Sequence, residues 1–236
     1  MRILAFGPNG SGKGTQGTII KERYGLDHIE SGEIFRHHIK AGTELGLKAK
    51  AYIDEGNLVP DDLTIPMVVD ALKKSNDRGW ILDGFPRSLS QAKALQETLR
   101  DLKMRVDYVF EIELDREEAK KRIMGRRICA IGSNHPNHIA FEAIHPAEKD
   151  GVLVCRVCGG KLSMREDDQD EDAINQRHDI YYDEDQGTMA AVIHYRGNCA
   201  ARNIQVDGDR GISDIAEEVL SEIEEGEAIK LRAKFG

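Results

Sequence analysis

The sequence has no long apolar run and no excess of positive charge. None of its apolar stretches approaches the roughly 20 residues that cross a bilayer, and its start does not resemble a secretory signal. The formal net charge of −9 disfavours a surface that binds nucleic acid non-specifically. We therefore expect a cytoplasmic protein without membrane or nucleic-acid partners, which must gather its basic side chains locally if it binds anions.

Cysteine is also scarce, and its spacing argues against a disulfide framework. Four cysteines occur in 236 residues, and two of them stand as Cys155-x-x-Cys158, which is the spacing of metal ligands. Such use of cysteine fits a reducing compartment. Internal repeats and low-complexity linkers are lacking too, so the length suits one domain with insertions, or one to two domains.

A phosphate-binding loop follows the first apolar run, residues 3–6. The glycines and the lysine of this loop are Gly7, Gly10, Gly12 and Lys13. Glycines let the backbone point its N–H groups at a di- or triphosphate, the following helix dipole favours the same anion, and the lysine adds a mobile positive charge. Gly14 stands where most phosphate loops carry the Ser or Thr that binds magnesium, and Thr15 comes one residue later.

Strand-like apolar runs alternate with stretches of helical spacing. The runs cover residues 3–6, 27–29, 80–82, 106–114 and 204–206. One predicted helix has Asp61 or Asp62 as its cap and Pro66 near its first turn, and another covers 213–220 with Ser213 as its cap. This alternation predicts an α/β fold with a parallel, doubly wound sheet, whose ligands bind at the carboxyl ends of the strands.

Two stretches break this alternation. Residues 30–59 indicate short helices punctuated by glycines, and residues 125–168 hold most of the cysteines and many histidines among turn residues. Both are predicted to be insertions at the rim of the nucleotide site. The acidic run 166–172 fits a solvated helix start, where carboxylates complement the helix dipole, or a hinge that uses Asp167 and Asp168.

Seven motifs resemble those of adenylate kinases of the long-lid type, in order and over nearly the full chain. They are GPNGSGKGTQ (7–16), IESGEIFR (29–36), EGNLVPDDLT (55–64), LDGFPRSLSQA (82–92), GRRICA (125–130), REDDQDED (165–172) and QVDGD (205–209). The resemblance implies reversible phosphoryl transfer from MgATP to AMP, which gives two ADP and serves adenine nucleotide homeostasis. This family also has a glycine directly after the lysine of its phosphate loop and a threonine one residue later, as Gly14 and Thr15 are placed here.

The resemblance also implies the division of the chain. A parallel-sheet P-loop nucleoside monophosphate kinase core would comprise residues 1–29, 60–124 and 169–236. A small helical insertion that binds the monophosphate would comprise residues 30–59, and a metal-ribbon-like lid would comprise residues 125–168. We expect the lid to close over ATP.

The same resemblance implies site residues. Those for ATP are Gly10, Ser11, Gly12, Lys13, Gly14, Thr15, Arg122 and Arg126. Those for AMP are Ser31, Arg36, Asn57, Val59, Gly84, Arg87, Gln91, Arg165 and Arg177. The catalytic cations are Lys13, Arg87, Arg122, Arg126, Arg165 and Arg177. Asp83 would orient water around Mg²⁺, and Arg177 matches the family only with one residue inserted after Arg165. We expect no general base, because an AMP phosphate oxygen is already an ionised nucleophile.

The metal-bearing lids of this family pair two Cys-x-x-Cys motifs, and here the first pair is broken by Gly132. The cysteines that remain in the lid are Cys129, Cys155 and Cys158. We expect His135, in a turn-like Asn-His-Pro context, to be the fourth ligand, with His138 as the alternative. Four protein ligands make a structural site, and this set suits Zn²⁺, with Co²⁺ or Fe²⁺ also possible.

Two other functions stay open on the sequence. The chain could be a kinase for another monophosphate, which the long lid and Gln91 count against. It could also be a metal-ribbon module that binds nucleic acid or protein, which the acidic balance and the complete phosphate loop disfavour. For an adenylate kinase we expect ATP, AMP and ADP as partners, and a monomer.

Overall fold

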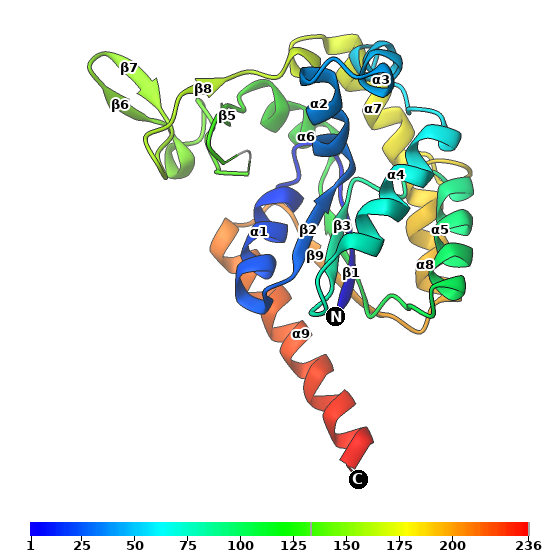
Figure 1. The fold of residues 1–236 in the computed structure, drawn as a ribbon. Helices are drawn as coiled ribbons and strands as arrows, with labels where there is room; N and C mark the ends of the chain where they lie inside the picture. Colours follow the sequence, from blue (N-terminus) through cyan, green and yellow to red (C-terminus); the bar gives the residue numbers. More distant parts are fainter. Residues whose placement is uncertain (133, 236) are drawn as a thin grey trace.

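The computed structural model describes residues 1–132 and 134–235, and its centre is a sheet with helices on both faces (Figure 1). The strands of this sheet are β1 (Arg2–Phe6), β2 (Asp27–Glu30), β3 (Trp80–Asp83), β4 (Tyr108–Glu113) and β9 (Arg202–Asp207). They lie in the order β2-β3-β1-β4-β9, and all neighbours are parallel. The predicted α/β class is confirmed, and each predicted strand overlaps one strand of the sheet.

Both faces of the sheet are buried. The helices beside it are α1 (Lys13–Tyr24), α4 (Asp61–Lys74), α5 (Leu89–Asp101), α6 (Arg116–Met124), α7 (Glu171–Tyr182), α8 (Thr188–Asn198) and α9 (Ile212–Phe235). Successive side chains of a strand point to opposite faces. Along β1, Ile3 and Ala5 enter the apolar cluster on the side of α1 and α9, whereas Leu4 and Phe6 enter the cluster with α4, α5 and α8. This two-sided packing holds the carboxyl ends of β1 and β3 at one edge.

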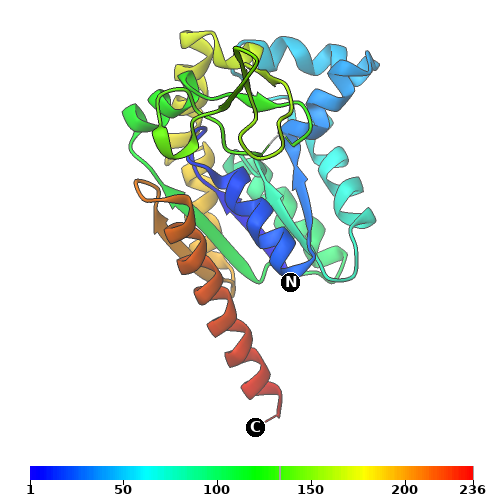
Figure 2. The same ribbon diagram turned by 90° about the vertical axis from the view of Figure 1, so that its left-hand side faces the viewer.

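Two insertions lie beyond that edge. After β2 come α2 (Ser31–Lys40) and α3 (Glu44–Asp54), with no strand between them among the described residues, as predicted. After α6 comes the insertion predicted to be the lid, called the lid insertion (residues 125–168), whose described residues form two small antiparallel ribbons and two 3-10 turns. These are β5 (Ile128–Cys129) with β8 (Leu162–Ser163), β6 (Ala147–Lys149) with β7 (Val152–Val154), Glu142–Ile144 and Glu166–Asp168. Figure 2 shows the lid insertion in front of the N-terminal end of α1.

The start of α4 differs from the prediction. Its N-cap is Pro60, whose side chain makes no capping hydrogen bond, and Asp61 and Asp62 lie in the first turn. Their carboxylates complement the helix dipole there without capping it. Pro66 is the sixth residue of the helix, one or two residues further in than either predicted cap would place it. The helix accommodates Pro66 because a proline removes a single backbone donor near the amino end.

The last helix is much longer than predicted. α9 runs for 24 residues from Ile212 to Phe235, so Ser213 lies inside it and is not its cap. Its first half is fixed to the sheet, because Ile215, Val219 and Ile223 are buried in the same cluster as β1. Its far end extends beyond the core (Figures 1 and 2). Over the described ranges, no helix combines the length and the apolar character needed to cross a membrane.

Candidate active site

The phosphate loop joins the end of β1 to the start of α1. Gly10 and Gly12 have φ angles of +94° and +90°, which L side chains rarely adopt. A Cβ atom on Gly10 would lie 2.4 Å from the carbonyl oxygen of Ala119, so α6 packs directly on the loop. Gly12 is the N-cap of α1, and within the described part of the chain no side chain caps that helix. The first N–H groups of α1 therefore face the cleft as donors for an anion.

Lys13, the first residue of α1, lies beside Asp83 at the end of β3. The Lys13 Nζ and an Asp83 carboxylate oxygen are 3.8 Å apart; the Asp83 side chain is buried, and the Lys13 side chain is 16% exposed. Burial lowers the pKa of Lys13 below its ordinary value, although Asp83 opposes this. Burial acts to raise the pKa of Asp83, but the charge of Lys13 and the nearby His28 outweigh it, so that pKa lies below its ordinary value. The pair is therefore an ionised carboxylate and a partly desolvated ammonium.

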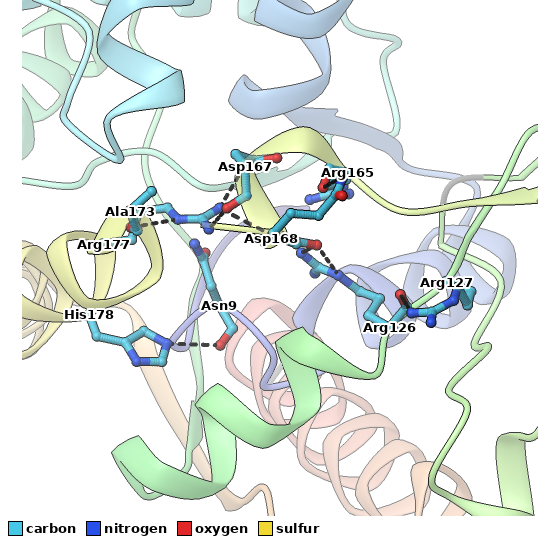
Figure 3. Close-up of polar contacts among 10 residues, drawn as sticks. Asn9, Arg126, Arg127, Arg165, Asp167, Asp168, Ala173, Arg177 and His178 are labelled. Carbon is cyan, nitrogen blue, oxygen red and sulfur yellow. Dashed lines mark hydrogen bonds and ion pairs between the residues drawn. The ribbon is translucent and has the colours of Figure 1, made fainter. Parts of the chain in front are cut away.

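Two of the predicted arginines share carboxylates where the chain leaves the lid insertion (Figure 3). Arg126 donates from Nε and Nη2 to Asp168 Oδ2, at 3.0 and 2.6 Å. Arg177 donates to the carboxylate of Asp167 and lies 3.5 Å from the other oxygen of Asp168. Asp168 is only 8% exposed, so a solvated helix start is the wrong interpretation for this residue. These pairs join the entrance of the lid insertion to α7.

The same network carries more positive charge than its carboxylates neutralise. Burial and the charges of Arg126 and Arg36 lower the pKa of Arg165 to about 9. An anion bound here would relieve that repulsion. From α7, His178 Nε2 lies 3.3 Å from the backbone oxygen of Asn9 in the phosphate loop (Figure 3). The loop and the arginines are thus held together through α7.

One large cavity lies between the phosphate loop and the lid insertion. Its volume is about 500 Å³. All the residues predicted for ATP line it, together with Asp83: Gly10, Ser11, Gly12, Lys13, Gly14, Thr15, Arg122 and Arg126. Arg122 is fixed by bonds to the carbonyl of Gly208 (2.7 Å) and the carboxylate of Asp209 (3.0 Å). Its guanidinium carbon lies 5.9 Å from the ring centroid of Phe141, an aromatic wall that our sequence analysis missed.

A smaller cavity of about 80 Å³ adjoins the first. All nine residues predicted for AMP line it: Ser31, Arg36, Asn57, Val59, Gly84, Arg87, Gln91, Arg165 and Arg177. Gln91 is buried with both ends of its amide engaged, because its oxygen accepts from Arg87 N and its nitrogen donates to Asp61, each at 2.8 Å. Arg87 Nε donates to the carbonyl of Gly84 at 2.7 Å, and the Ser31 hydroxyl donates to the same oxygen at 2.6 Å.

The lid insertion contains a compact group of metal-ligating side chains. One ligand atom each from Cys129, His135, Cys155 and Cys158 lies within 4.8 Å of the others, so the four could hold one metal ion. The Cys129 and Cys158 sulfurs are 3.4 Å apart, and Cys155 Sγ is 3.5 Å from His135 Nδ1. His138 lies outside the group: it accepts from Ala140 N and stacks on Phe141.

A second polar cluster at the end of β2 was not anticipated. His28, Glu30 and Asp83 each place one ligating atom within 4.8 Å of the others. His28 Nδ1 is 3.8 Å from Glu30, and its Nε2 is 3.7 Å from Asp83 and has no hydrogen-bond partner among the described residues. The sequence did hold a signal, because polar residues at the carboxyl end of a parallel strand face the ligand site.

This fold and this cleft define a class: a phosphate-loop nucleotide-binding protein whose cationic cleft suits phosphoryl transfer. The family model described as "Adenylate kinase" matches residues 5–198. Proteins named adenylate kinase from Desulfotalea psychrophila and Solidesulfovibrio magneticus are 61% and 56% identical to this chain, over 94% and 95% of it and 98% and 100% of their own lengths. The chain belongs to the adenylate kinase family. It is therefore a nucleoside monophosphate kinase, and the alternative of a metal-ribbon binding module is set aside.

Proposed function

We propose that this chain transfers the γ-phosphoryl group of MgATP to AMP and, in reverse, forms ATP and AMP from two ADP. One observation carries the proposal: Arg36, Arg87 and Arg165 line both the large cavity and the small one. Guanidinium groups between two adjoining cavities are placed to bind two polyanions and the charge that passes between them. Two nucleotides in these cavities would meet at this group.

The large cavity is the proposed ATP site. Gly10 to Thr15 would bind the phosphates through backbone N–H groups, and Lys13 would follow the transferred group. Arg122 and Phe141 would flank the base, while Arg126 would bind the phosphate chain. The lowered pKa of Lys13 supports this role, because an anionic partner would compensate for the partial desolvation of its ammonium group.

The small cavity is the proposed AMP site. Arg36 and Arg87 would bind its phosphate, and Ser31, Asn57, Val59 and Gly84 would contact the nucleoside. Because both ends of the Gln91 amide are engaged, Gln91 would recognise the adenine edge only by exchanging one of these partners. Arg165 and Arg177 would complete the cluster of positive charge at the transferred phosphoryl group.

Magnesium accompanies ATP in the proposed reaction, where it neutralises phosphate charge when bound. Asp83 is suited to bind water molecules around Mg²⁺ rather than the ion itself, because its carboxylate is buried, ionised and at the floor of the cleft. Water hydrogen-bonded to Asp83 would be oriented there. The residues of the chain would position the two nucleotides, exclude water and supply positive charge, and no general base is needed.

We also propose three working parts. Residues 1–29, 60–124 and 169–236 would form the core, residues 30–59 the AMP-binding part, and residues 125–168 the lid. The lid insertion lines the large cavity with residues 134–138 and 140–144, so its movement would open that cavity to solvent. Its closure would exclude water and suppress ATP hydrolysis.

The proposed lid metal is Zn²⁺, with Co²⁺ and Fe²⁺ as alternatives, and its proposed ligands are Cys129, His135, Cys155 and Cys158. Three sulfurs and one imidazole nitrogen in one small group match the donor set of a structural zinc site. Four protein ligands leave no open position for substrate, so this metal would be structural.

Thiols at ligand spacing also support our proposal of a cytoplasmic enzyme. A monomer remains our prediction, which light scattering would test.

A coupled assay with AMP, GMP, CMP and UMP as acceptors tests the function. We expect turnover with AMP to exceed turnover with any other acceptor at least tenfold. Faster turnover with another monophosphate would show that the chain is a kinase for that monophosphate and not for AMP. Absence of transfer to all four would contradict the proposal.

A further inference from the structure

One residue of the lid insertion makes three contacts with residues outside that insertion. The side-chain nitrogen of Asn134 donates to Glu30 Oε1 at 2.7 Å, and its backbone oxygen accepts from the Thr15 hydroxyl at 3.3 Å. Its side-chain oxygen lies over the phosphate loop, where a Cβ on Gly14 would come within 2.5 Å of it. These contacts join β2, the phosphate loop and the lid insertion at one residue.

Glu30 is a fixed acceptor for this contact. It is the last residue of β2, in register with Asp83 of β3, and it is also the N-cap of α2. Its side chain is 13% exposed, and its carboxylate lies 3.8 Å from His28. A largely desolvated carboxylate that accepts an amide N–H forms a charge-assisted hydrogen bond, which is among the stronger kinds. The contact therefore has the strength to bias a movement of the lid.

Asn134 is equally well supported from the lid side. It precedes His135, whose ring lies in the Cys/His group, and His135 N donates to the backbone of Gly132 at 3.0 Å. Three residues further on, Asn137 donates to Cys155 Sγ and accepts from Arg156 N. The segment that carries Asn134 is thus tied to the rest of the lid insertion, and a rigid lid would carry Asn134 with it.

We propose that Asn134 and Glu30 are positioning residues that latch the closed lid onto the phosphate loop. The proposal rests on the proposed function, since it assumes that the lid insertion closes over ATP. The latch adds its free energy only in the closed form. The apparent affinity for ATP depends on how much of the protein is closed, so loss of the latch weakens ATP binding without touching the transferred group.

The first test is Asn134→Ala in the full-length, metal-loaded protein. Loss of a hydrogen bond to a charged group should raise KM and Kd for ATP about tenfold. KM for AMP should stay unchanged, and kcat should fall less than about threefold, because no group at the phosphoryl centre is lost. Lys149→Ala, at an exposed position of β6, is the matched control and should behave as the original protein.

A swapped pair tests the contact itself. Asn134→Asp places a second carboxylate against Glu30 and should weaken ATP binding more than Asn134→Ala does. Adding Glu30→Gln restores the hydrogen bond with donor and acceptor exchanged and returns the total charge to that of the original pair. The double variant should recover at least half of the loss in log Kd, whereas Glu30→Ala in its place should not.

The latch is wrong if Asn134→Ala keeps its KM for ATP within about twofold, or if the swapped pair binds ATP no better than Asn134→Asp alone. It is also wrong if Asn134→Ala lowers kcat and raises both KM values together, since that indicates general damage. If the protein without substitutions does not phosphorylate AMP, that result contradicts the proposed function and not the latch. Metal content, measured for every variant, separates the latch from loss of the Cys/His group.

Discussion

The sheet core and the lid insertion are stabilised in different ways. The core buries large side chains completely, among them Trp80, Tyr108 and Phe110. The lid insertion leaves several large apolar side chains in solvent, with Ile131 75% exposed and Val152 63% exposed. Among its described residues, the buried apolar side chains are those of Cys129, Pro146 and Cys155. The difference supports our proposal that the core folds by burying apolar surface, whereas the lid insertion depends on a bound metal to hold one conformation.

Removal of cationic groups from the cleft should give the largest effect and leave both regions folded. Lys13→Met and Arg87→Ala should each cost about 3 kcal/mol in the barrier, about a hundredfold in rate, because each removes a charge-assisted donor from a dry site. Steady-state turnover with circular dichroism checks this. Arg100→Ala, on the exposed side of α5, is the control. Near-normal activity of either cleft variant would contradict the site.

Substitution of the proposed metal ligands should destabilise the lid insertion and leave the core unchanged. His135→Ala and Cys155→Ser should lose most of the lid metal and lower the unfolding temperature of the lid by several degrees or more, because metal binding supplies its folding free energy. Phosphoryl transfer at low temperature should largely survive. Elemental analysis checks the metal, and His138→Ala is the matched control because that ring lies outside the Cys/His group. If His135→Ala retains its metal in full and His138→Ala loses it, the fourth ligand is His138 and not His135.

Closure should bring the two regions together in solution. A ligand that carries two linked adenosines and spans both cavities should lower the radius of gyration measured by small-angle scattering, because it contacts the lid insertion and the core at once. Arg87→Ala at the same ligand concentration should show a smaller change, since it binds the ligand less well. An unchanged radius at saturation would contradict closure of the lid.

A buried carboxylate gives the core a small pH dependence of its own. Burial raises the pKa of Glu111 above its ordinary 4.5, although Arg196 opposes this. The folded state therefore binds this proton more tightly than the unfolded one. Its contribution to stability is greatest below pH 4.5 and declines as the pH rises through the raised pKa. Glu111→Gln should flatten that decline in urea unfolding of the sheet, and an unchanged slope would contradict it.

Residue spacing predicted the fold and the phosphate loop, whereas the other residues of the nucleotide site followed only from the resemblance to adenylate kinases. The alternation of strands and helices gave the parallel sheet, and the Gly-Lys loop placed the nucleotide site. Predictions failed where a distant partner decides the outcome. Asp168 looked solvated within an acidic run, but Arg126, 42 residues earlier, buries it. Glu30 and Asn134 stand 104 residues apart, and no local pattern connects them.

Hydrogen exchange after removal of the metal tests the contrast between the regions most directly. The protein is chelated under non-denaturing conditions, and exchange is followed by mass spectrometry in peptides from the lid insertion and from β1, β3 and β4. We predict that lid peptides lose protection at least tenfold while sheet peptides stay unchanged, and that added Zn²⁺ restores the lid. Equal loss in both regions, or full lid protection in metal-free protein, would contradict the account.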